Sequence, residues 1–68
     1  MRGHWVIALL PPVVIVRGLR AGDRLRNAGL KPMWGVSARG WVLDARHLRD
    51  VCAVAESERI PYRIEGRR

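Results

Sequence analysis

Residues 11–17 read PPVVIVR, and this stretch decides the fold. The two prolines stop any helix, and the four β-branched residues after them are typical of a central strand buried on both faces. We therefore predict a strand over 13–17, preceded by a candidate short strand at Trp5–Leu10. Because the prolines interrupt the apolar run and an arginine follows it, we predict neither a signal peptide nor a membrane span.

Two helices are predicted after this strand, from the residues that mark where one ends and the other begins. The first covers residues 20–28, because Gly29 suits the left-handed position after a helix. The second covers residues 45–59, with Asp44 as its N-cap. We expect its apolar stripe to pack on the sheet together with two residues of the first helix. The stripe is Leu48, Val51, Cys52 and Ala55, and its companions are Leu25 and Ala28.

The remaining elements are strands. Residues 32–36 and 40–43 are predicted to form a β-hairpin that pairs Val36 with Trp41, and 62–65 alternates as an edge strand. The element order β-α-β-β-α-β is that of a small split β-α-β, ferredoxin-like α+β domain. The apolar N-terminal segment is an addition to this unit.

Length and composition exclude several classes of protein. The 68 residues are predicted to form one small basic domain, with the apolar segment at 1–12 and a flexible tail at 66–68. A chain of this size buries only about 60% of its unfolded surface, which leaves no room for a deep substrate cleft, so we expect no enzyme. One cysteine excludes an internal disulfide, and two distant histidines lack zinc-ligand spacing. No catalytic residue, metal or cofactor is predicted.

The charge pattern indicates nucleic acid as a partner. A formal net charge of +7 attracts polyanions, and arginines beside tryptophans suit unpaired bases, which stack on indole rings. Either tryptophan of the hairpin can be a core residue or a ligand-facing one. Two arginines at the start of the second helix oppose the helix dipole, which a bound phosphate would relieve. The candidate binding residues are Arg20, Arg24, Lys31, Trp34, Arg39, Trp41, Arg46 and Arg49.

The hairpin also has a recognisable pattern. Residues 29–34 read GLKPMW and residues 39–43 read RGWVL, and an amphipathic helix follows. Over residues 29–55 this resembles the HARP-type domain of annealing helicases and related small modules. The resemblance implies binding to nucleic acid, with DNA favoured over RNA, often at single-strand or junction structures, through Trp34, Arg39 and Trp41, with Lys31 beside them. The chain departs from the family beside Trp34, where the family places a charged residue.

The sequence leaves a second function open. A small phage-type module that docks on a host protein and modulates it is the alternative, with Trp5–Leu10 adding a strand to a partner sheet. We also expect a homodimer through residues 5–10, because this apolar segment must be covered. A membrane-surface peptide is disfavoured, since neither helix combines a basic face with a bulky apolar one. Small size and a composition rich in Arg, Ala, Gly and Val fit a cytoplasmic, actinophage-type accessory protein.

Overall fold

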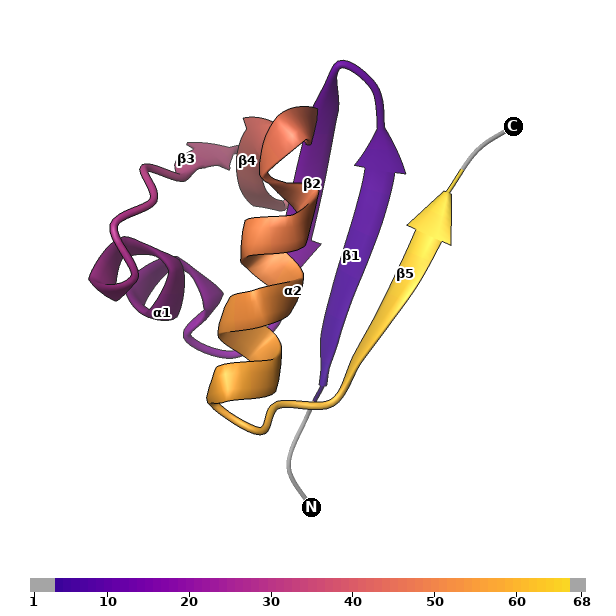
Figure 1. The fold of residues 1–68 in the computed structure, drawn as a ribbon. Coiled ribbons are helices and arrows are strands. Elements are labelled where there is room, and N and C mark those ends of the chain that lie inside the picture. Colours follow the sequence, from indigo (N-terminus) through magenta and orange to yellow (C-terminus); the bar gives the residue numbers. More distant parts are fainter. Residues whose placement is uncertain (1–3, 67–68) are drawn as a thin grey trace.

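The computed structural model describes residues 4–66 and contains a five-stranded mixed sheet with two α-helices on one face (Figure 1). The strands are β1 (Trp5–Leu10), β2 (Val13–Arg17), β3 (Met33–Gly35), β4 (Gly40–Asp44) and β5 (Tyr62–Gly66). The helices are α1 (Ala21–Asn27), the 3₁₀ helix η1 (Ala45–His47) and α2 (Leu48–Ser57). The α+β class is confirmed. Of the predicted tail, Gly66 ends β5 and residues 67–68 lie outside the described part of the chain, as do residues 1–3.

The strand order is β3-β4-β2-β1-β5, so β2 is the middle strand of the sheet. β1 pairs antiparallel with β2 and parallel with β5. The N-terminal segment therefore enters the sheet as a fifth strand, and the sheet differs from the four-stranded split β-α-β arrangement that we expected. The reason is the two-residue turn at Pro11 and Pro12, which folds β1 back onto β2.

The place of β1 changes the expected mode of association. Both of its edges are occupied, one by β2 and the other by β5. Trp5 and Ile7 are buried within the chain itself. In this fold, residues 5–10 cannot pair with a strand of a second copy or add to a partner sheet.

The core lies between the sheet and the two helices. The largest buried side chain of β1 is Trp5, and β2 contributes Val14 and Val16. Val51 and Ala55 of α2 are buried against them, and the stripe predicted for this helix is confirmed by the partial burial of its other members, Leu48 and Cys52. Leu25 of α1 is also buried, whereas Ala28 is exposed, contrary to prediction. It follows the last residue of α1 and faces the space between the helices.

The end of α1 follows the predicted capping pattern. Gly29 has φ +93°, and its N–H donates to the carbonyl of Arg26 at 3.0 Å. The N–H of Leu30 donates to the carbonyl of Leu25 at 3.0 Å, which completes the Schellman motif.

The second helix is shorter than predicted. Asp44 Oδ1 accepts a hydrogen bond from the N–H of Arg46 at 3.0 Å, as an N-cap should, but the chain first makes the 3₁₀ turn η1. α2 ends at Ser57 because Arg59 adopts φ 58° and the N–H of Ile60 closes back onto the carbonyl of Ala55 at 2.8 Å.

The hairpin register is offset by two residues from the prediction, because Trp41 pairs with Trp34 and not with Val36. An even offset keeps every side chain on its expected face. The positive φ of the turn belongs to Arg39, at 54°, and not to Gly40. Gly40 lies inside β4, where a Cβ would come within 2.7 Å of Ile15 Cγ2.

One hydrogen bond joins β5 to α2 and makes stability depend on pH. The hydroxyl of Tyr62 donates to Glu56 Oε2 at 2.7 Å, and this bond raises the pKa of Tyr62 from 10.0 to about 12. A raised pKa favours the protonated phenol in the folded state. The contribution of the bond to stability is therefore complete below pH 10 and is lost as the pH rises towards 12.

We expect an ultraviolet titration of Tyr62, the one tyrosine of the chain, to show its midpoint above 10. Glu56→Gln should bring the pKa back towards the ordinary value, because the phenol then loses its charged acceptor. An unchanged midpoint in this variant would contradict the assignment of the shift to Glu56.

Candidate nucleic-acid interface

Two tryptophans meet at the β3 edge of the sheet. The ring centroids of Trp34 and Trp41 are 5.2 Å apart and the rings are inclined at 69°, an edge-to-face arrangement. Trp41 packs partly buried against the core, whereas Trp34 is 53% exposed. The sequence left open whether each tryptophan is a core residue or faces outward. Trp41 packs against the core, and Trp34 presents its indole to solvent.

Helix α1 holds Trp41 in place from above the sheet. A Cβ on Gly22 would lie 2.4 Å from Trp41 Cε2 and Cζ2, so glycine is required for this close approach. One turn later, Arg26 places its Cζ 5.3 Å from the centroid of the Trp41 ring, within cation–π range. Nη1 of Arg26 also lies 3.4 Å from Asp23 Oδ1, in an exposed ion pair.

Arg26 is a candidate site residue that the sequence analysis did not predict. The available signal was Gly22, because a glycine within a helix indicates close packing of that face. Residues four apart share a helix face, so Gly22 and Arg26 point to the same neighbour. The predicted candidates on α1 were instead Arg20 and Arg24.

Two further arginines frame the turn between β3 and β4. Arg17 donates from Nε and Nη2 to the carbonyl of Ala38, at 3.1 and 2.9 Å, and so braces the turn. Arg39 is exposed, and its backbone N–H donates to the carbonyl of Gly35 at 2.7 Å. We call the set Arg26, Trp34, Arg39 and Trp41 the tryptophan edge.

The other predicted cations lie in three further places. Arg20 and Arg24 line a surface hollow on α1 together with Arg26, which connects them to the tryptophan edge. Lys31 lines a separate hollow beside η1, the element that carries Arg46. Arg49 is exposed in the first turn of α2. Among residues 4–66, the structure shows no ion pair for Arg20, Lys31, Arg39, Arg46 or Arg49.

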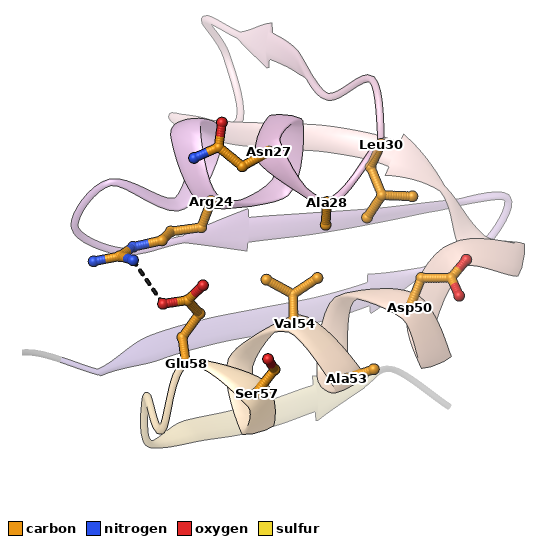
Figure 2. A pocket seen from close by; sticks show the side chains of 9 residues that line it. All are labelled: Arg24, Asn27, Ala28, Leu30, Asp50, Ala53, Val54, Ser57 and Glu58. Carbon is orange, nitrogen blue, oxygen red and sulfur yellow. Dashed lines mark hydrogen bonds and ion pairs between the residues drawn. The ribbon is translucent and has the colours of Figure 1, made fainter.

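Arg24 differs from the other cations that the sequence predicted for the site, because it forms an ion pair. Its Nη1 lies 2.6 Å from Glu58 Oε1 at one end of a groove between α1 and α2, with a volume of about 550 Å³ (Figure 2). Apolar side chains such as Val54 line the middle, and Asp50 lies towards the other end. One arginine against two carboxylates makes the groove itself unattractive to phosphate.

Comparison with protein-family models, with curated proteins and with solved structures gives no match for this chain. Within residues 4–66, neither helix has the length and apolar character that a membrane crossing requires. The tryptophan edge is therefore the feature from which we infer a function.

Proposed function

We propose that this chain is a non-enzymatic binding protein for unpaired nucleic acid, which it contacts through the tryptophan edge. The observation that carries the proposal is the half-exposed indole of Trp34, held against Trp41 and accompanied by Arg26 and Arg39. The hairpin that carries the edge lies within the segment resembling HARP-type DNA-binding modules. DNA is therefore the nucleic acid that we propose.

Base stacking supplies the first part of the mechanism. The two rings meet edge to face and do not stack on each other, so the exposed part of Trp34 is free to receive a base. Stacking of one base on an aromatic side chain contributes about 1–3 kcal/mol. A base within a duplex is already stacked on its neighbours, and single strands should therefore bind more tightly than duplexes.

Phosphate binding supplies the second part. Arg39 is exposed at the turn beside Trp34, and the hollow with Arg20 and Arg26 extends the positive surface along α1. Each phosphate that these side chains neutralise releases counterions, which makes the affinity depend on salt. The phosphate contacts position the strand, and Trp34 holds the base.

Fluorescence anisotropy with labelled single- and double-stranded DNA at two salt concentrations tests the proposal. We expect Trp34→Ala to weaken single-strand binding by roughly five- to a hundred-fold, the loss of one stacked base. Arg39→Ala should flatten the slope of log affinity against log salt by about 0.7, the value for one phosphate contact to a single strand. Both variants should remain folded. Trp34 is 53% exposed, and at Arg39 a residue with a Cβ already adopts φ 54°, so alanine adds no backbone strain there.

Two matched controls make the test specific. Arg63→Ala removes the same charge from β5, the opposite edge of the sheet, and should change binding only slightly. Leu19→Ala truncates another exposed apolar side chain, outside the edge, and should leave binding unchanged. The proposal fails if the wild-type protein binds no oligonucleotide at low salt, or if Arg63→Ala weakens binding as much as Arg39→Ala.

A protein-interaction module remains the alternative, and one observation favours it. Met33 and Val36 on either side of Trp34 are 73% and 79% exposed, and β3 is an edge strand of the sheet. An exposed apolar edge strand suits the addition of a strand from a partner protein. The site for such a partner is then β3 and not the buried Trp5–Leu10 segment. Failure of the wild-type protein to bind oligonucleotides would favour this function.

A further inference from the structure

Among residues 4–66, no helix covers the sheet face opposite α1 and α2 (Figure 1), and much of this face consists of apolar residues. The strand register aligns its side chains in neighbouring rows, one of which runs from Ala8 through Ile15 and Val42 to Met33. Ala8 and Ile15 are buried by their neighbours, yet they take no part in the core between sheet and helices. We call this surface the open face; its apolar members are Val6, Ala8, Leu10, Val13, Ile15, Met33 and Val42.

The residue pattern of β2 requires a cover on both sides. An antiparallel strand with one solvated face alternates apolar and polar residues. In β2, Val14 and Val16 face the helices, but Val13 and Ile15 on the other side are equally apolar. The helices therefore cover only Val14 and Val16 of this strand, and Val13 and Ile15 on the open face have no layer packed over them within the described part of the chain.

The charged residues on the open face indicate what kind of molecule can pack against it. Two arginines, Arg17 and Arg63, share this side of the sheet with two acidic residues, Asp44 and Glu65. The face is thus balanced, although the chain as a whole carries a net charge of +7. A second copy can approach here without bringing like charges together, whereas a polyanion gains no attraction.

We infer that a second copy of this chain covers the open face, sheet against sheet. Arg17 ends β2 and Asp44 ends β4, and these strands are antiparallel. A two-fold axis lying across the strands therefore places the Arg17 end of each copy over the Asp44 end of the other. This dimer replaces the strand-pairing dimer that the sequence led us to expect, and it leaves the tryptophan edge of each copy accessible.

The area of the face sets the strength of the dimer. Five strands spaced about 4.8 Å apart, each with about five residues at 3.3 Å per residue, give about 400 Å² per copy. The pair buries about 800 Å², which is below the range of stable interfaces and typical of weak association. We therefore expect a dimer that forms with increasing concentration.

Sedimentation equilibrium from about 10 μM to about 1 mM, the range in which such a weak dimer forms, tests this inference. The wild-type protein should approach twice its 7.7 kDa mass with increasing concentration. Val42→Lys places a charge within the open face and should keep the chain monomeric, while its circular dichroism spectrum shows that it is folded. Val36→Lys is the matched control, because Val36 lies in the exposed turn outside the strands, and it should dimerise like the wild type.

A measurement on the wild-type protein guards against misfolding of the variant. On dilution, methyl NMR signals should shift at Leu10, Val13, Ile15 and Val42, with smaller changes on α1 and α2. A wild-type chain that stays monomeric at the highest concentration, or dilution shifts confined to the helices, would overturn the inference. Both measurements are made without nucleic acid, so their failure is distinct from failure of the proposed function.

Discussion

Replacing Trp5 by alanine is expected to lower the free energy of unfolding by about 3–5 kcal/mol. Trp5 is 1% exposed and is the largest buried side chain of the core. Its Nε1 also donates to the carbonyl of Leu19 at 3.4 Å, and its strand lies between β2 and β5. Proteins have about 0.05–0.15 kcal/mol of stability per residue, so this loss removes a large part of the total for so small a domain.

Urea unfolding followed by circular dichroism measures this effect, with Trp34→Ala as its control. Trp34 is the exposed member of the tryptophan pair, so its truncation should cost less than that of Trp5, about 1–2 kcal/mol. Equal losses in the two variants would contradict the core that the structure describes. The comparison also shows that loss of DNA binding by Trp34→Ala does not result from unfolding.

The second large effect is expected at Gly18, next to the same tryptophan. Gly18 has φ +154°, and a Cβ there would lie 2.2 Å from Trp5 Cδ1 and 3.0 Å from Trp5 Cγ. Alanine must therefore either displace the buried indole, at about 1–3 kcal/mol, or move the backbone. The backbone conformation itself adds about 1–3 kcal/mol for a residue with a side chain. We expect Gly18→Ala to destabilise the fold by the sum of the two effects.

Gly29→Ala separates the two contributions to this loss. Gly29 also has a positive φ, +93°, but nothing lies within 4 Å of the position that its Cβ would occupy. Its replacement should therefore cost only the backbone term, about 1–2 kcal/mol. If thermal or urea unfolding gives the same loss of stability for Gly18→Ala and Gly29→Ala, the close contact between Gly18 and Trp5 contributes nothing to the effect of Gly18→Ala.

Much of the local structure was predictable from the sequence, because its signals lie within a few residues of one another. The prolines before Val13, the glycine after the first helix and the aspartate before the second all act on adjacent backbone. The stripe of α2 follows from helical spacing alone. Within the proposed site, Trp34, Trp41 and Arg39 were predicted from residue type, and the structure places them on one hairpin.

Only the tertiary structure decided the strand order, the hairpin register and the partner of each arginine. Pairing of Trp5 with Tyr62 joins residues at opposite ends of the chain, and local propensity cannot distinguish this arrangement from pairing with β2 alone. Arg24 and Arg26 are the same residue type, two positions apart on α1, yet Arg24 forms an ion pair with Glu58 and Arg26 lies over the ring of Trp41. Such contacts depend on how α1 is oriented over the sheet, where Gly22 allows the close approach of the helix to Trp41. The sequence by itself determined which segments become strands and helices, because those preferences are local, whereas neighbours in space depend on packing across the whole core.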